Sequence, residues 1–364
     1  MKTVLDVTVC THSKGGVGRW VKGLSMGLSA VNSEHISLDV EETHKGIKSE
    51  VPGATILPLP FWMHLPLLRR VFYKKGLLQK TRTDRIQSIV GVPDVIHLSG
   101  VQPFGNARKK VVTFFDDTPW TNPSSHTADT LFYAKRLKNL INEGASLLTI
   151  SNWSASVARE LFSLSSERVG NAGGAVEDYF VPGEPDLEVM LKYNLKPDGY
   201  FLHVGSFVPR KNIPFLVKCF SGLEVKTDVK LVLVGAEQWG DELLENNKDV
   251  LFLKNISDKE LVTLYQGAIS LLIPSSKEGL GLPVLEAFAC NTPVISSDGG
   301  ALPETVGDSG LILPALSVEL WVQALRDVLS GRTTNSLREK AVSAYCPRWT
   351  DVGRKAIQFY RSLQ

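Results

Sequence analysis

The sequence predicts an α/β protein made of two doubly wound, Rossmann-like domains that face a cleft. Its 364 residues correspond to about two domains of ~150 residues each. Short β-branched segments alternate with longer helical segments throughout, which is typical of parallel sheets covered by helices on both faces. Residues 175–198 hold two proline-containing turns and no strand pattern, so we expect the interdomain linker there.

The first half contains four predicted strands and one clear helix. A glycine-rich turn follows the first strand, and Trp20–Val31 then follows as a helix. The predicted strands are Val4–Cys10, Pro93–Leu98, Lys110–Phe115 and Leu147–Ile150. We place the N-terminal domain at residues 1–180.

The second half repeats the pattern, and we place the C-terminal domain at residues 181–346. Ser257 and Glu260 have the spacing of a capping box at the start of one helix. The predicted strands are Tyr200–Val204, Val229–Val234, Leu251–Leu253, Ser270–Ile273, Pro293–Ser296 and Leu311–Leu313. In doubly wound sheets, ligands bind beyond the carboxyl ends of the strands, so both domains should line the cleft.

Composition excludes several classes of protein. Hydrophobic residues make up 43% and charged residues 21%, which excludes general disorder. A net charge of +2 argues against a dedicated nucleic-acid-binding protein. The four cysteines form no Cys-x-x-Cys pair, so zinc-finger and thiol-redox motifs are excluded. We find no secretory signal and no apolar segment of ~18 residues, and therefore expect a cytoplasmic protein.

The strongest candidate site is the segment from Lys277 to Glu304. Glu278 lies in the loop before a helix that begins near Pro283, and Glu286 lies about one turn inside that helix. Two carboxylates suggest a glycosidase pair, but eight residues of helix rise about 12 Å. This exceeds the ~5–9.5 Å between the carboxylates of glycosidases. From the spacing alone, a buried helix with no ligand is an equal alternative.

Two further segments have the composition of phosphate-binding turns. Arg210 and Lys211 follow a strand and the glycine Gly205, and adjacent cations at such a turn suit a diphosphate, although a solvated surface pair is the commoner case. Gly15, Gly16 and Gly18 follow the first strand but lack the remainder of a P-loop or dinucleotide-binding motif.

Together these segments resemble the retaining glycosyltransferases of family 4, which have the GT-B fold. The resemblance rests on the Glu278–seven residues–Glu286 motif, the Gly205 to Asn212 pattern and the glycine loop at Gly16. Weaker matches extend over nearly the whole chain. Residues 347–364 resemble the family's closing helix, which packs back on the N-terminal, acceptor-side domain.

The resemblance implies a role for each matching residue. Glu278 would contact the donor sugar and Glu286 the donor ribose, while Arg210 and Lys211 would neutralise the diphosphate. The resemblance also implies nucleotide-sugar contacts from Gly16, Gly205, Asn255, Ile256, Gly279 and Leu280. Arg210, Lys211 and Glu278 are our candidate catalytic residues, together with Asp116.

Asp116 is a candidate because of a departure from the family pattern. A His-Asp pair is usual after the strand that ends here in Phe115-Asp116-Asp117, so Phe115 replaces that histidine. One of the two aspartates would serve the acceptor, or would equally be a loop carboxylate with local hydrogen bonds.

Residues 59–85 combine aromatic and apolar side chains with seven cations and a single acid, Asp84. This composition fits a segment that contacts an anionic membrane surface, or an ordinary solvated helix.

The sequence thus predicts a retaining, metal-independent hexosyltransferase. It would use a nucleoside-diphosphate sugar as co-substrate, without other cofactors, and a glycan or lipid-linked glycan as acceptor. We expect it to act in surface polysaccharide or lipopolysaccharide biosynthesis, in the cytoplasm or peripherally on the inner membrane face. The alternatives are a nucleotide-sugar epimerase or hydrolase of the same fold and a non-catalytic nucleotide-sugar-binding protein.

Overall fold

The computed structural model describes residues 1–12, 15–41, 51–58, 84, 87–88, 90–99, 107–223, 228–235 and 247–363. The chain divides into two compact units. Unit 1 comprises Met1–Gly174 and Arg348–Gln364, and unit 2 comprises Ala175–Pro347. The predicted membrane-contacting segment, residues 59–85, lies outside the described residues except for Asp84.

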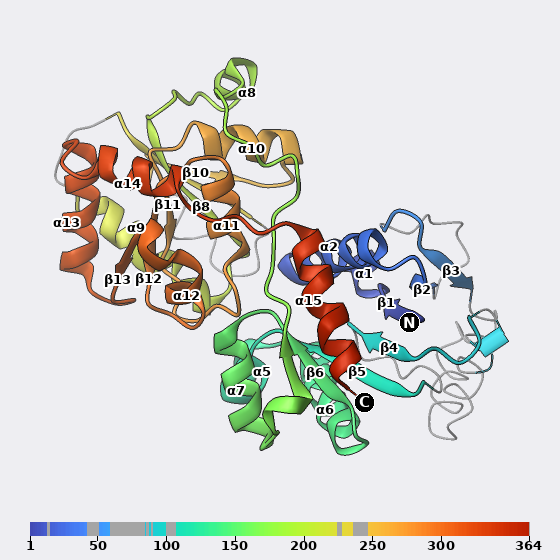
Figure 1. The fold of residues 1–364 in the computed structure, drawn as a ribbon. Coiled ribbons are helices and arrows are strands. Elements are labelled where there is room, and N and C mark those ends of the chain that lie inside the picture. Colours follow the sequence, from blue (N-terminus) through green and yellow to red (C-terminus); the bar gives the residue numbers. More distant parts are fainter. Residues whose placement is uncertain are drawn as a thin grey trace. The chain divides into compact units, whose positions relative to one another are not determined.

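Unit 1 contains a seven-stranded parallel sheet in the order β3-β2-β1-β4-β5-β6-β7 (Figure 1). Its strands are β1 Thr3–Asp6, β2 His35–Glu41, β3 Thr55–Pro58, β4 Val95–Leu98, β5 Lys109–Phe114, β6 Ser146–Thr149 and β7 Val169–Asn171. Its α-helices are α1 Val9–His12, α2 Gly16–Val31, α5 Thr118–Thr121, α6 Ala128–Asn142, α7 Asn152–Phe162 and α15 Trp349–Ser362. Two 3₁₀ turns, Pro123–Ser125 and Ser166–Arg168, complete its described elements.

The structure corrects the first predicted strand, which ends at Asp6 rather than at Cys10. The Oδ1 atom of Asp6 accepts a hydrogen bond of 3.0 Å from the backbone N–H of Thr8. This local bond turns the chain away from the sheet, and α1 begins at Val9. The sequence analysis also missed β2, β3 and β7.

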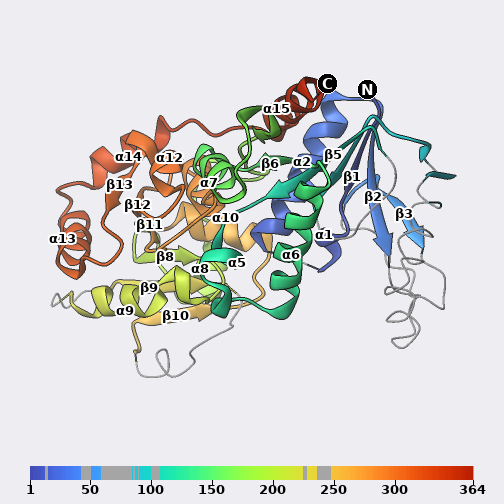
Figure 2. The same ribbon diagram turned by 90° about the horizontal axis from the view of Figure 1, so that it is seen from below.

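The helices α15 and α2 pack closely within unit 1, as both views show (Figures 1 and 2). The contact depends on glycine. A β-carbon at Gly27 would lie 2.0 Å from the backbone oxygen of Trp349, and one at Gly353 would lie 2.4 Å from the carbonyl carbon of Gly27. At Gly27 and Gly353 the two backbones therefore touch directly.

Unit 2 contains a six-stranded parallel sheet in the order β10-β9-β8-β11-β12-β13. Its strands are β8 Tyr200–Val204, β9 Lys230–Val234, β10 Val250–Leu253, β11 Ser270–Ile273, β12 Val294–Ser297 and β13 Leu311–Leu313. Its α-helices are α8 Leu187–Lys192, α9 Ile213–Ser221, α10 Asp258–Gln266, α11 Leu282–Ala289, α12 Leu302–Val306, α13 Val318–Leu329 and α14 Thr334–Val342. The predicted capping box of Ser257 and Glu260 is confirmed at the start of α10.

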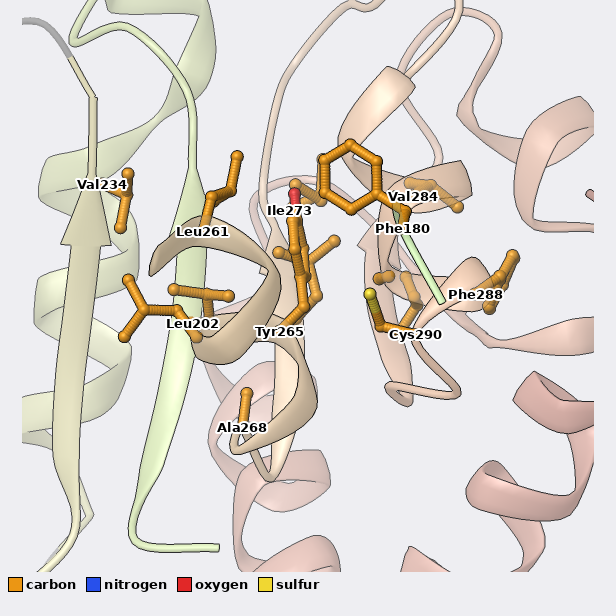
Figure 3. Packing of buried hydrophobic residues seen from close by; sticks show 14 of the residues in the cluster. Phe180, Leu202, Val234, Leu261, Tyr265, Ala268, Ile273, Val284, Phe288 and Cys290 are labelled. Atoms are coloured by element: carbon orange, nitrogen blue, oxygen red, sulfur yellow. The ribbon is translucent and has the colours of Figure 1, made fainter. Parts of the chain in front are cut away.

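Both faces of the unit 2 sheet are buried. Successive residues of one strand enter different hydrophobic clusters: Leu202 and Leu271 belong to one, and Phe201 and Leu272 to the other. Burial on both faces explains why these strands have nearly continuous apolar sequences. Figure 3 shows the first cluster, with Tyr265 close to Phe180.

The segment expected to be a linker, residues 175–198, is part of the unit 2 core. Its apolar side chains Val176, Phe180, Met190 and Leu195 are all buried in the cluster that contains Tyr265. Phe180 meets the Tyr265 ring edge-on, at 5.8 Å between centroids. A proline-rich segment without a strand pattern had suggested a linker, but its spaced apolar residues anchor it to the core.

Candidate active site

The order of the strands determines where the candidate residues of unit 2 meet. The chain winds outward in both directions from the neighbouring strands β8 and β11. The turn with Arg210 and Lys211 follows β8, and the loop with Glu278 follows β11. The two segments therefore lie next to each other at the carboxyl edge of the sheet, at the switch point where such folds bind ligands.

Arg210, Lys211 and Glu278 form one ion-paired cluster. Nη1 of Arg210 donates to Oε2 of Glu278 at 2.9 Å, and Nζ of Lys211 donates to Oε1 at 2.5 Å. Nη1 of Arg210 also donates to the backbone oxygen of Lys277 at 3.0 Å. One carboxylate thus fixes two cations that are adjacent in sequence.

Burial makes this cluster electrostatically strong. Glu278 and Lys211 are 7% and 8% exposed. Burial alone would raise the pKa of Glu278, but the charges of Lys211 and Arg210 outweigh it and hold that pKa well below its usual range. Two cations and one carboxylate leave a formal charge of +1, which suits an anionic ligand.

The backbone around Glu278 is held by the loop after β12. Ala301 donates its N–H to the carbonyl of Glu278 at 2.9 Å. A β-carbon at Gly300 would lie 2.4 Å from that carbonyl oxygen, and the φ of Gly300 is +66°. Gly281, with a φ of +93°, begins the turn into α11. The glycines of this region therefore shape the loop in addition to any ligand contact.

Glu286 lies on α11, five positions into the helix, and is fully buried. Its Oε2 accepts a hydrogen bond of 2.7 Å from the hydroxyl of Tyr265 on α10. The predicted ribose-binding carboxylate is thus held by a buried phenol, a partner that the sequence motif did not suggest.

The remaining predicted donor-binding residues of unit 2 also lie in loops that follow strands. Gly205 directly follows β8, and its N–H donates to the carbonyl of Val234 at 2.9 Å. Asn255 and Ile256 follow β10; Asn255 is exposed, with a φ of +54°. Gly279 and Leu280 lie between Glu278 and α11.

In unit 1, Gly16 begins α2 and is exposed. Asp116 is partly buried, and its Oδ1 accepts hydrogen bonds from the N–H and the hydroxyl of Thr118, at 2.9 Å and 2.6 Å. This carboxylate supports the turn into α5, which is the local role that the sequence analysis left open. Phe115, which stands where the family has histidine, packs edge-on against Trp20 at 5.6 Å.

Sequence reasoning missed two features of the site. It treated Arg210 and Lys211 as cations waiting for a ligand, whereas Glu278 already pairs with both. It also missed His203, a fully buried residue two positions before Gly205. Opposite charges that follow two neighbouring strands could have suggested the ion pairs of Glu278 with Arg210 and Lys211. The signal for His203 was a histidine inside an otherwise apolar strand.

Comparison with known proteins agrees with this geometry. Residues 191–344 match the family described as glycosyl transferases group 1. The match includes the Arg210–Lys211–Glu278 cluster and Glu286.

Curated relatives are similar over part of their length. The chain is 33% identical to the O-antigen chain mannosyltransferase B of Escherichia coli over 60% of this chain and 62% of that protein. It is 28% identical to the O-antigen chain mannosyltransferase RfbU of Salmonella typhimurium over 61% of each. The matches thus span less than two thirds of these relatives.

Solved structures share the fold over nearly the whole chain. Sucrose-phosphate synthase from Thermosynechococcus elongatus aligns with a TM-score of 0.75 and 18% identity, over 100% of this chain and 99% of that chain. WaaG, a glycosyltransferase involved in lipopolysaccharide biosynthesis, aligns with a TM-score of 0.72 and 16% identity, over 98% of both. The protein therefore has the GT-B fold of these enzymes.

None of the helices in the described ranges is long and apolar enough to cross a bilayer. No group of three or more His, Cys, Asp or Glu side chains in those ranges is placed to hold a metal ion.

Proposed function

We propose that the chain is a retaining glycosyltransferase that moves a hexose from a nucleoside-diphosphate sugar to a glycan acceptor. The observation that carries the proposal is the ion-paired cluster of Arg210, Lys211 and Glu278, with Lys211 and Glu278 buried, within the segment that matches the glycosyltransferase family. Its position beyond the carboxyl ends of β8 and β11 is where a doubly wound sheet binds a nucleotide. Donor-bound structures of the same fold, such as Anabaena HepE with UDP-glucose, support a nucleotide-sugar donor.

In this proposal the cluster stabilises the leaving group. When the bond between the anomeric carbon and the diphosphate breaks, its electron pair passes to the diphosphate oxygen. Arg210 and Lys211, already oriented by Glu278, neutralise the charge that develops there. Because the cations are in place before the bond to the diphosphate breaks, little reorganisation is needed during the reaction.

We propose that transfer retains the anomeric configuration. The acceptor hydroxyl attacks the face from which the diphosphate departs, and its proton passes to the departing diphosphate oxygen. This route requires no protein nucleophile. It also requires no divalent cation, because Arg210 and Lys211 supply the positive charge. Turnover that depends on added Mg²⁺ or Mn²⁺ after EDTA treatment would contradict this part of the proposal.

The names of the relatives support a more specific substrate class. Several curated relatives are mannosyltransferases, and two act on O-antigen chains by name. We therefore propose mannose as the transferred sugar and a surface polysaccharide, free or lipid-linked, as the acceptor. Residues 59–85 carry the further proposal of peripheral contact with anionic membranes from the cytoplasmic side, from composition alone.

The test begins with the donor. Thermal shifts measured with the GDP and UDP derivatives of mannose, glucose and galactose would identify the donor, since a ligand that binds only the native state raises its stability. The identified donor is then incubated with oligomannose or lipid-linked acceptors, and the products are analysed by mass spectrometry and NMR. We expect an extended acceptor with an α-linked mannose. Free sugar formed equally with and without acceptor would instead indicate a hydrolase, and an altered nucleotide sugar would indicate an epimerase.

A liposome sedimentation assay tests the membrane proposal. Wild type should pellet with anionic vesicles. Pelleting should decrease as salt rises, because the screening length falls to about 8 Å at physiological ionic strength. A variant with serine at Arg69, Arg70, Lys74 and Lys75 should pellet less. If both proteins pelleted equally, or if neither pelleted, the membrane proposal would be excluded.

A further inference from the structure

His203 lies inside β8 and is 0% exposed. Its Nδ1 lies 2.8 Å from the carbonyl oxygen of Leu272 on β11. Since a carbonyl oxygen only accepts hydrogen bonds, Nδ1 carries the proton. Burial lowers the pKa of His203 to about 4, with the Leu272 carbonyl opposing and the Lys211 charge adding to this shift. The ring is therefore neutral near pH 7, and its Nε2 carries a lone pair.

That lone pair has no hydrogen-bond partner within the described part of the chain. A buried acceptor of this kind is uncommon, because burial removes the water that would otherwise bind it. The position of Nε2 is defined by Gly205. A β-carbon there would lie 3.3 Å from Nε2 of His203 and 3.5 Å from Nζ of Lys211. The imidazole acceptor and the ammonium donor therefore border the same small space.

We propose that His203 is a positioning residue for Lys211. When a nucleoside diphosphate binds, its negative charge competes with Glu278 for the ammonium group. Nε2 of His203 then accepts a hydrogen bond from Nζ, which holds Lys211 against the diphosphate. The absent side chain at Gly205 leaves room for this movement. The inference rests on the proposed function, because it assigns the diphosphate to the same cluster.

Two substitutions distinguish the role of Nδ1 of His203 from that of Nε2. His203→Asn places an amide near the position of Nδ1 and keeps the bond to Leu272, but has no acceptor at the position of Nε2. His203→Gln is longer and can present an acceptor near the position of Nε2. We expect His203→Asn to lower kcat about tenfold with a small change in KM for the donor. His203→Gln should recover most of that loss.

The decisive control is the Lys211→Ala background. Because His203 acts through Lys211, His203→Asn should cause no further loss of kcat there, so that the two effects are not additive. Equal losses from His203→Asn in both backgrounds would overturn the inference. A lower Tm for His203→Asn with unchanged kcat would assign a purely structural role and would also overturn it.

An NMR measurement tests the hydrogen bond itself, without sugar transfer. In protein labelled with ¹⁵N-histidine, addition of GDP or UDP should move the Nε2 resonance of His203 in the direction of hydrogen bonding. The resonance is assigned by its loss in His203→Gln. Lys211→Ala should abolish the shift at saturating nucleotide. An unmoved Nε2 resonance with bound nucleotide would refute the positioning role, whereas the absence of any nucleotide binding would refute the proposed function.

Discussion

Tyr360 and His97 are joined by a hydrogen bond of 2.6 Å between the phenol oxygen and Nδ1. It connects α15 to β4, across 263 positions in the sequence. The other ring nitrogen of His97 lies 2.9 Å from the hydroxyl of Thr113 on β5. Both ring nitrogens of a buried histidine are therefore occupied, and one partner comes from the helix that follows all of unit 2.

Replacing Tyr360 with phenylalanine should destabilise the protein by about 1–3 kcal/mol, because it leaves a buried ring nitrogen unpaired. Chemical denaturation followed by far-UV circular dichroism measures the change in the free energy of unfolding. Tyr345→Phe, at a tyrosine that is 75% exposed, is the control and should be neutral. Equal stability of Tyr360→Phe and wild type would show that water or a rearranged Thr113 replaces the bond.

The buried histidines predict a loss of stability in acid. Burial lowers the pKa of His35 to about 4, and burial with the added effect of His35 lowers that of His97 to about 3. In the unfolded chain both return to about 6.5. Their contribution to the free energy of unfolding is therefore complete above pH 6.5. It declines as the pH falls toward 4, since the unfolded state binds more protons than the folded state in this range.

Each such histidine should add up to about 1.4 kcal/mol per pH unit to the decline over this range. Urea unfolding at pH 7.5, 6 and 5 measures it. His97→Gln should show a shallower dependence on pH than wild type, although it is less stable at pH 7.5. Parallel curves for the two proteins would argue against a neutral His97.

Removing either cation of the ion-paired cluster should reduce catalysis. Arg210→Ala and Lys211→Ala should each lower kcat at least about tenfold, because a charge-assisted contact to the diphosphate contributes about 1.5–3 kcal/mol. Lys259→Ala is the matched control: it also loses an ion pair, with Asp186 at 2.8 Å, but on the surface. Rates within twofold of wild type for both site variants would exclude their role.

The two glutamates should respond differently to the same substitution. Glu278→Gln should mainly lower kcat, since it releases the two cations that act on the leaving group. Glu286→Gln should mainly raise KM for the donor, since a ribose contact is equal in ground and transition states. The amide of Glu286→Gln can still accept the bond from Tyr265, so the fold should be kept. An effect of Glu278→Gln on KM alone would require the roles to be reassigned.

The backbone contact between α2 and α15 should not tolerate a methyl group. Gly353→Ala should lower the free energy of unfolding by about 1–3 kcal/mol or more, because the new atom would overlap the backbone at Gly27. Met26→Ala, at an exposed position on α2, is the control. A Tm for Gly353→Ala equal to that of wild type would mean that the helices separate at little cost.

All six described strands of unit 2 could be predicted from sequence because both faces of its sheet are buried. Burial on both faces produces compact runs of Val, Leu and Ile, as in Lys230–Val234 and Ser270–Ile273. The missed strand β2, His35–Glu41, has polar and charged residues at alternate positions. It lacks the continuous apolar run by which we identified the other strands.

The candidate site was predictable as segments but not as contacts. The resemblance to the family motifs indicated Arg210, Lys211 and Glu278 one by one. Their pairing depends on the neighbouring positions of β8 and β11, which are far apart in the sequence. The same holds for the bond from Tyr265 to Glu286. Contacts between segments that are far apart in the sequence depend on the order of the strands, and local sequence does not specify that order.

The packing of α15 on α2 also bears on how the chain is made. All of unit 2 is synthesised after residue 174 and before residue 348. The glycine-lined side of α2 therefore remains uncovered on the ribosome while unit 2 emerges, and its partner helix arrives only later. Unit 2 is continuous in sequence and can complete its own fold first, although it is translated second. The part of the chain that starts to emerge first is thus the part that finishes folding last.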